Sequence, residues 1–291
     1  MSDSRYDLTS LIERLDRLIT LVAGSLESRI LEINWQETKA ARWRVKKNGQ
    51  GFFEGVSRLP TIRLDDLKHI DDQKTRLFNN THQFVLGKSA NNVLLTGARG
   101  TGKSSLIKAL VNEFGHQGLR LIEVDKEHLL DLPDIVESLS TYPQRFIVFC
   151  DDLSFEANES QYKTLKTVLD GSVSETPHNV LIYATSNRRH LMPEFLSDNQ
   201  QVDHRDGEIH PGETIEEKTS LSDRFGLWIS FYPVDQDTYL AIAQHWAKTL
   251  GAEDVHSETF RAEALTWALM RSSRSGRSAW QFARDWAGRL R

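Results

Sequence analysis

The chain has 291 residues, a formal net charge of -5, 39% apolar and 26% charged residues, which is the ordinary mix of a globular protein and argues against a general nucleic-acid coat. Its single cysteine excludes a disulfide framework and a cysteine-rich zinc module and favours a reducing compartment. Because no apolar stretch approaches the ~18 residues of a membrane span and the amino terminus does not resemble a signal peptide, we expect a cytoplasmic protein with no membrane partner.

Residues 8–33 carry apolar side chains at helical spacing, beginning with Leu8 and Leu11 and interrupted at Gly24. This pattern predicts a helical hairpin packed on the main body. The alternative is a helix that binds a partner or joins subunits.

Residues 37–47 are basic and contain Trp43, which is more typical of a solvated helix end than of a nucleic-acid contact. Asn48-Gly49 and Gly51 then mark a break in the chain. We therefore expect an N-terminal helical extension over residues 1–55.

From residue 92 onward, short apolar runs alternate with helical segments such as 104–114 and 161–169. The runs predict strands covered on both faces: Asn92 to Thr96, Arg120 to Val124, Phe146 to Cys150, Val180 to Thr185 and Leu227 to Phe231. This alternation indicates an α/β core with a five-stranded parallel sheet over residues 56–232. Three further helices are predicted at 235–250, 257–271 and 275–289, which would form an all-helical domain over residues 233–291.

Residues 97–104 read GARGTGKS and fit the phosphate-loop pattern G-x-x-x-x-G-K-[ST], between an apolar strand and a helix. Glycines let the backbone amides curl around a phosphate, and the helix N-terminus adds partial positive charge. Lys103 can reach the β- and γ-phosphates, and the Ser104 hydroxyl can bind Mg²⁺. The expected phosphate-binding residues are Gly97, Ala98, Arg99, Gly100, Thr101, Gly102, Lys103, Ser104 and Ser105.

A second motif is the apolar strand FIVFC, which ends in Asp151 and Asp152. Asp151 would lie beside the phosphate loop and hold Mg²⁺ together with Ser104. Asp152 would polarise the attacking water, with Glu156 as the second choice.

With these two motifs, the chain resembles the AAA+ ATPase superfamily over about residues 60–291. The resemblance implies an αβα sandwich with a C-terminal helical lid, and it implies bound ATP or ADP with Mg²⁺. In YATSN, Asn187 looks like the residue called sensor 1, which positions the water, with Thr185 second. In LSDRF, Arg224 looks like the arginine finger that reaches a neighbouring subunit, although a structural ion pair is the alternative.

The resemblance also implies two contacts near the lid. Arg277 in SGRSA looks like sensor 2, with Arg274 as the second choice, and Ile70 would touch the adenine base. More closely, GARGTGKSS, FCDDLSFE, YATSNRRHLMPE and LSDRFG resemble an uncharacterised bacterial AAA+ group of ATP-binding proteins of unknown function.

Two departures from the family pattern bear on mechanism. Asp152 stands where many members have Glu, and the pattern Asp-Asp-aliphatic-x-Phe resembles the replication-initiator branch, which hydrolyses ATP slowly. Residues 125–130 contain no aromatic-aliphatic-Gly pore loop, which weakens any role in threading polypeptides.

Several other features are given structural interpretations. Residues 198–220, with His204 and His210, predict a polar surface loop without a metal site. Cys150 is expected to be an inert buried thiol. Trp267, Trp280 and Trp286 have spacings that suit core packing, with base stacking as the alternative.

The function that the sequence favours is an Mg²⁺-dependent AAA+ ATPase that couples nucleotide state to remodelling or assembly of a macromolecular partner. Arg224 implies a homo-oligomer, and a hexameric ring is one form that it could take. The alternative is a slowly hydrolysing ATP switch or scaffold that acts on nucleic acid or a replication-type complex. The partner, protein or nucleic acid, has no signature in the sequence.

Overall fold

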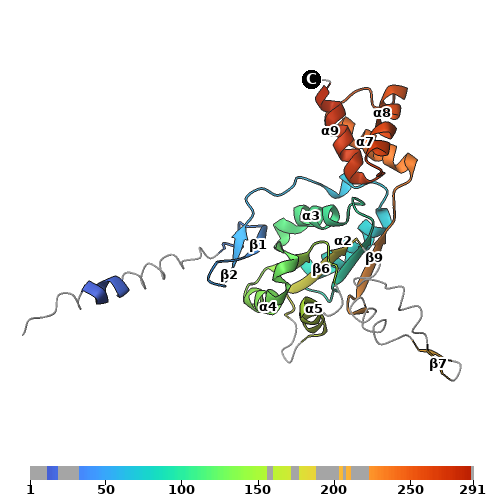
Figure 1. Ribbon diagram of the computed structural model, residues 1–291. Coiled ribbons are helices and arrows are strands. Elements are labelled where there is room, and N and C mark those ends of the chain that lie inside the picture. The colour runs from blue at the N-terminus through green and yellow to red at the C-terminus, as the bar shows by residue number, and fades with distance from the viewer. Residues whose placement is uncertain are drawn as a thin grey trace, which may run out of the picture.

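The computed structural model describes residues 12–18, 33–155, 160–171, 177–187, 203–205, 208–210 and 223–289. Its main body is a seven-stranded sheet in the order β2-β1-β4-β5-β6-β3-β9 (Figure 1). The strands are β1 (Ala40–Val45), β2 (Gly51–Gly55), β3 (Val93–Gly97), β4 (Leu119–Val124), β5 (Arg145–Cys150), β6 (Val180–Ser186) and β9 (Leu227–Phe231). Every neighbouring pair is parallel except β1 and β2. The five predicted strands are confirmed as β4, β5, β6, β3 and β9, and two more strands extend the sheet.

Helices cover both faces of the sheet. The helices α2 (Asp71–Val85) and α3 (Lys103–Phe114) pack on one face, and α4 (Leu132–Ser140) and α5 (Ser160–Asp170) on the other. Short 3-10 turns lie at η1 (Leu64–Asp66), η2 (Gly115–Gln117) and η3 (Lys126–Asp131). In β3, Leu94 packs in one apolar layer while Val93 and Leu95 pack in the other, as alternation along a strand requires. The predicted αβα sandwich is therefore present.

Three helices form a separate unit beyond the sheet: α7 (Gln236–Thr249), α8 (Glu258–Met270) and α9 (Gly276–Arg289). Figure 1 shows this unit, the lid, above the end of α3. The lid has its own apolar core, in which Tyr239, Phe260 and Phe282 are fully buried. Its three predicted helices are confirmed.

The prediction that residues 40–55 belong to a helical extension is wrong. They form the antiparallel hairpin of β1 and β2, with Trp43 opposite Phe53, and β1 pairs in parallel with β4. Arg42 and Arg44 point outward and form ion pairs of 3.0 Å to Glu123 and 2.9 Å to Asp125. Alternating charged and apolar side chains before Asn48-Gly49 are typical of a β-hairpin. The sequence analysis instead took the basic residues as the end of a helix.

A buried arginine ties this hairpin region to the sheet. The Arg120 side chain, 4% exposed, donates to four backbone carbonyl oxygens, those of Trp35, Gln36, Gly115 and Leu119. Burial lowers the pKa of Arg120. Because the acceptors come from two segments far apart in sequence, the guanidinium holds the chain before β1 against the end of α3.

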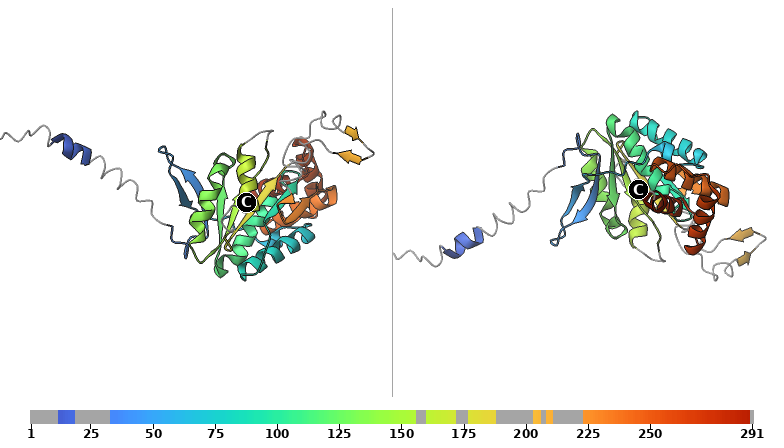
Figure 2. Two further views of the ribbon diagram at one scale, coloured as in Figure 1. Left: turned by 90° about the horizontal axis from the view of Figure 1, so that it is seen from below. Right: turned by 90° about the horizontal axis from the view of Figure 1, so that it is seen from above.

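Most of the predicted N-terminal hairpin at residues 8–33 lies outside the described residues. The short helix at 12–18 lies away from the main body (Figures 1 and 2), and its Ile12, Leu15 and Leu18 are more than half exposed. Packing of this helix on the main body, the first of the two interpretations, is therefore not found.

Part of the loop predicted at 198–220 is a small antiparallel hairpin of β7 (Asp203–Arg205) and β8 (Glu208–His210). Figure 2 shows this hairpin and the β1–β2 hairpin on opposite sides of the molecule. The side chains of the β7–β8 hairpin, including His204 and His210, lie outside the described part of the structure. Across the described residues, every helix is too short or too polar to cross a membrane.

Candidate nucleotide site

The loop between β3 and α3 has a backbone that only glycine adopts easily. Gly97 has φ 127°, and a Cβ there would stand 1.9 Å from the carbonyl oxygen of Phe231 on the neighbouring strand. Gly100 has φ 77°, and a Cβ there would stand 2.8 Å from Oγ of Ser275 in the lid. The glycines therefore allow the loop to curl between β9 and the lid.

Lys103, the first residue of α3, is 6% exposed, and its side chain reaches back under the loop. Its Nζ donates to the carbonyl oxygens of Gly97 at 2.6 Å and Ala98 at 2.9 Å, and to Oδ1 of Asn187 at 3.1 Å. Burial lowers the pKa of Lys103, and two nearby carboxylates oppose this effect. An ammonium group is therefore fixed between the loop and the end of β6.

Asp151 follows the last residue of the buried strand β5 and faces the N-terminus of α3. Its Oδ1 accepts from Oγ of Ser104 at 2.8 Å and from Oγ1 of Thr185 at 2.5 Å. Hydroxyl and carboxylate oxygens are hard ligands of the kind that Mg²⁺ prefers, and Mg²⁺ completes its shell with water and phosphate oxygens. Ser104 and Asp151, the two predicted metal ligands, therefore lie together and fit this ion.

Asp152 lies next to this pair in a left-handed backbone conformation, with φ 54°, which is uncommon for a residue other than glycine and is often found at functional sites. Its backbone N–H donates to Oγ1 of Thr185 at 2.9 Å, and its carboxylate accepts from Nδ2 of Asn187 and faces Arg99 at 3.4 Å. Both residues considered for sensor 1 thus contact this cluster. Glu156, the second choice for the base, lies outside the described residues.

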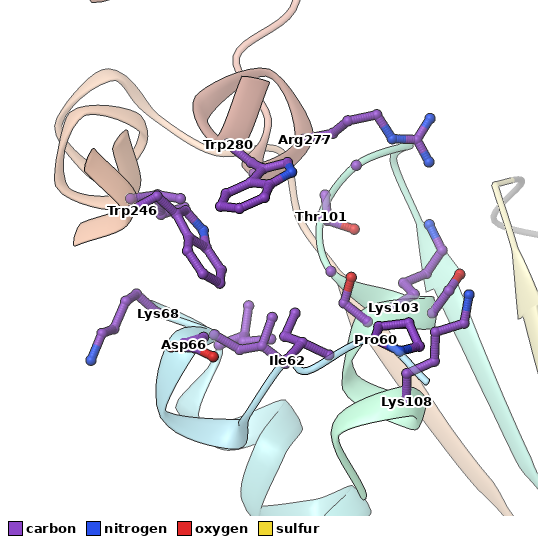
Figure 3. A pocket seen from close by; sticks show the side chains of 18 of the residues that line it. Pro60, Ile62, Asp66, Lys68, Thr101, Lys103, Lys108, Trp246, Arg277 and Trp280 are labelled. Atoms are coloured by element: carbon purple, nitrogen blue, oxygen red, sulfur yellow. The ribbon is translucent and has the colours of Figure 1, made fainter. Parts of the chain in front are cut away.

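The loop, the strand ends and the lid enclose a pocket of about 1080 Å³, large enough for a nucleotide. At one end lie Lys103, Ser104, Asp151 and Asp152. At the other end, apolar side chains of the core face tryptophans of the lid (Figure 3). The larger apolar side chains that line the pocket are those of Ile62, Leu67, Ile70, Ile242, Trp246, Leu250 and Trp280.

Ile70, predicted to touch the adenine base, lines the pocket and lies immediately before α2. Trp246, which the sequence analysis did not single out, and Trp280, for which core packing was preferred over base stacking, both line the pocket, with ring centroids 4.7 Å apart. Trp286, by contrast, packs in the lid core as predicted, at 9% exposure.

Arg277, at the start of α9, joins the lid to the phosphate loop through a backbone hydrogen bond. Its backbone N–H donates to the carbonyl oxygen of Gly100 at 3.3 Å, and the residue lines the pocket. Figure 3 shows its side chain on the side of the phosphate loop, away from Trp246. Of the two arginines considered for sensor 2, Arg277 is the one at the site, and Arg274 is not among the pocket-lining residues.

Arg224, the predicted arginine finger, does not line the pocket of its own chain. Its Nε lies 2.5 Å from Oδ1 of Asp170, the last residue of α5. The geometry therefore shows an ion pair within the chain, and a role toward a neighbouring subunit stays a prediction.

The fold is similar to those of solved structures at low sequence identity. One single-residue variant of Thermotoga maritima RuvB has a TM-score of 0.51 and 16% identity over 76% of this chain and 63% of that chain. A second such RuvB variant gives 0.52 and 15% over 78% and 65%. The Aeropyrum pernix ORC1 protein in complex with DNA gives 0.55 and 16% over 80% and 62%. The aligned part is less than two thirds of each of these chains, and it defines an AAA+ ATPase-like fold.

A family model described as "Protein of unknown function (DUF815)" matches residues 36–290. The chain therefore belongs to this family, and the expectation of an uncharacterised group is confirmed. No curated protein matches the chain.

Proposed function

We propose that this chain is an Mg²⁺-dependent ATPase of the AAA+ type that couples its nucleotide state to remodelling or assembly of a macromolecular partner. The observation that carries the proposal is the hydrogen-bonded cluster at the polar end of the pocket. There an ammonium, a hydroxyl and two carboxylates meet at the phosphate loop, with distances from 2.5 to 3.1 Å around Lys103, Ser104 and Asp151. This is the set of groups that phosphoryl transfer requires.

In this proposal the loop amides and Lys103 bind the β- and γ-phosphates, and Ser104 and Asp151 hold Mg²⁺. The ion supplies positive charge that balances the phosphate oxygens when it is bound. Asp152 accepts a proton from the attacking water, and Asn187 orients that water. In the structure Asn187 donates to Asp152 and accepts from Lys103, and these two contacts support the role proposed for it.

The remaining two arginines would respond to the nucleotide from different places. Arg277 is fixed to the phosphate loop by its backbone and belongs to the lid, so it can link the nucleotide to the lid position. Arg224 lies outside the pocket, and its guanidinium would serve the γ-phosphate of a neighbouring subunit in a homo-oligomer. Bidentate donors of this kind stabilise charge that develops on a transferring phosphoryl group.

The test is ATP turnover measured against protein concentration for the wild type, Lys103→Ala and Arg224→Ala, with Arg261→Ala on the exposed side of α8 as the matched control. We expect specific activity to rise with concentration and each site variant to lose about 10²-fold or more. Arg224→Ala should still bind ATP. Full turnover at high dilution together with an active Arg224→Ala would refute a shared active site, and an active Lys103→Ala would refute the assigned phosphate site.

A slow ATP switch that acts on nucleic acid is the second candidate. Asp152 has one methylene fewer than Glu and is held by Arg99 and Asn187, and one structural neighbour is ORC1 in complex with DNA. Tight ATP binding with turnover far below about 1 per second would favour this candidate. DNA affinity that depends on ATP and falls with salt would identify nucleic acid as the partner.

A further inference from the structure

One edge of the seven-stranded sheet is closed by side chains. In β9, Trp228 and Ser230 direct their backbone groups outward, since Leu227 donates to the residue directly before β3 and residues alternate along a strand. Helix α2 covers these groups: Arg76 donates to the carbonyl oxygen of Trp228 at 2.9 Å, and Gln73 donates to that of Ser230 at 3.1 Å. Covering of this kind prevents another strand from joining the sheet at β9.

The opposite edge, formed by β2, has an open row of backbone groups (Figure 1). The N–H of Lys46 donates to the carbonyl oxygen of Gln50 at 2.9 Å, so the even-numbered residues of β2 bond to β1. The N–H and C=O groups of Gly51, Phe53 and Gly55 point the other way, and in the described part of the chain they have no hydrogen-bond partner. An open edge is a template for a further strand.

The open row is complementary to itself. If two copies of β2 align antiparallel about a two-fold axis at Phe53, each Phe53 faces its own copy and each Gly51 faces Gly55. All of the outward N–H and C=O groups then find partners on the other copy. The two glycines carry no side chains, which suits the close approach of a second backbone.

The side chains fit the same arrangement. On the core face, the ring centroid of Phe53 lies 5.0 Å from that of Trp43 on β1, so pairing would continue a row of aromatic rings across the interface. On the other face, Phe52 would stand opposite Glu54 of the other copy, and Glu54 pairs within its own chain with Arg44 at 3.2 Å. Like charges do not face each other directly in this register. The occupant that fits the edge is therefore a second copy of this chain.

We infer that the β2 edge is a two-fold interface through which two copies of this chain join their sheets into one. The same five residues serve both copies, so the interface is isologous, whereas an arginine that reaches a neighbouring active site makes a heterologous contact. The inference therefore does not rest on the proposed function. Two strands of this length bury less than the ~1,200 Å² of a standard interface, so we expect a reversible dimer with a dissociation constant of about 10 to 100 µM.

The first test reads the register with single cysteines in the full-length protein without nucleotide. Phe52→Cys and Glu54→Cys are oxidised with diamide, each alone and as a mixture. In the paired strands these two positions have Cα atoms ~4.5 Å apart, which suits a disulfide, whereas each position is about 7 to 8 Å from its own copy. The mixture should therefore form about tenfold more disulfide-linked dimer than either variant alone. The natural Cys150 is fully buried and should not react.

The matched control for the first test is Asn48→Cys, at the exposed tip of the same hairpin, mixed with Phe52→Cys. This mixture should give only the background of random collisions. Equal cross-linking in the control, the single variants and the Phe52→Cys and Glu54→Cys mixture would overturn the inference, because the paired register would then be absent.

The second test is sedimentation equilibrium of the wild type, Gly55→Pro and Arg224→Ala, again without nucleotide. Gly55→Pro removes an outward N–H, a change that edge strands tolerate, and it should weaken the dimer about tenfold or more. Arg224→Ala should leave the dimer unchanged. The thermal midpoint of Gly55→Pro checks folding, and if this variant does not fold, the cysteine pair decides alone.

Two results of the second test would overturn the inference. One is a wild type that stays monomeric well above about 100 µM, because a strand from a different protein would then have to cover the edge. The other is a dimer that Gly55→Pro leaves intact and Arg224→Ala abolishes, because the contact would then lie near Arg224 and not at β2.

Discussion

The two ends of the pocket are built differently. At the phosphate end, hydrogen bonds of 2.5 to 3.1 Å join side chains of the αβα core that lie at strand ends or at the start of α3. At the base end, the surfaces come from two bodies with separate apolar cores. The phosphate end is thus fixed by the folding of the sheet, whereas the base end exists only when the lid stands where it does. Under the proposed function, hydrolysis would therefore depend on the core, whereas base binding would depend on the position of the lid.

The largest expected effect tests how rigidly the sheet holds the phosphate end. Cys150 is fully buried directly before Asp151, and burial raises its pKa from 9.0 to about 12. At about pH 8.5 the thiolate should then be about 10³-fold rarer in the folded than in the unfolded chain, so alkylation by iodoacetamide should be slower by at least that factor. Because the folded pKa is the higher one, folding carries no penalty below pH 9.0 and an increasing one above it. Fast labelling of the folded protein, compared with a urea-unfolded sample, would show that the end of β5 opens.

The next effect separates chemistry from binding at the same end. Asp152→Asn keeps the size of the side chain and removes the base, so hydrolysis should fall about 10²-fold in a single-turnover measurement. ATP affinity should change little, because Lys103 and Ser104 stay in place. Asp125→Asn, at an exposed carboxylate paired with Arg44, is the control and should keep full activity. Normal hydrolysis by Asp152→Asn would show that another residue acts as the general base.

The smallest effect concerns the contact between lid and phosphate loop. A Cβ on Gly276 would stand 3.1 Å from the carbonyl oxygen of Gly100, while a Cβ on Gly288 of the same helix would meet nothing within 4 Å. Gly276→Ala should push the lid away and weaken ATP about fivefold, a cost of ~1 kcal/mol for overpacking. Gly288→Ala should leave ATP affinity unchanged and stabilise the fold by about 0.5 to 1 kcal/mol. Equal ATP affinities in the two variants would mean that the close contact between Gly276 and Gly100 does not affect ATP binding.

The contrast between the two ends also explains what the sequence could predict. The phosphate loop and Asp151 were predicted from local patterns next to apolar strands, and Asn187 was predicted from the family resemblance. Trp246 and Trp280 follow no such pattern, since they are brought together only by the packing of α7 against α9. In β1, Arg42 and Arg44 made the segment look like a charged helix end. Their ion-pair partners lie on the neighbouring strand β4 and in the loop after it, so the local sequence does not reveal them. For Arg224 the sequence left a structural ion pair open as the alternative to an arginine finger, but it could not name the partner, because Asp170 lies at the distant end of α5.

Arg120 has a practical consequence for shortened versions of this chain. Two of its four acceptors are the carbonyl oxygens of Trp35 and Gln36. A truncation that begins at β1 would remove both and leave part of a buried guanidinium without hydrogen-bond partners, which is costly inside a protein. A truncation that begins at Ile33 keeps all four acceptors and the burial of Trp35 at 3% exposure. The smallest autonomous unit therefore starts several residues before the first strand of its sheet.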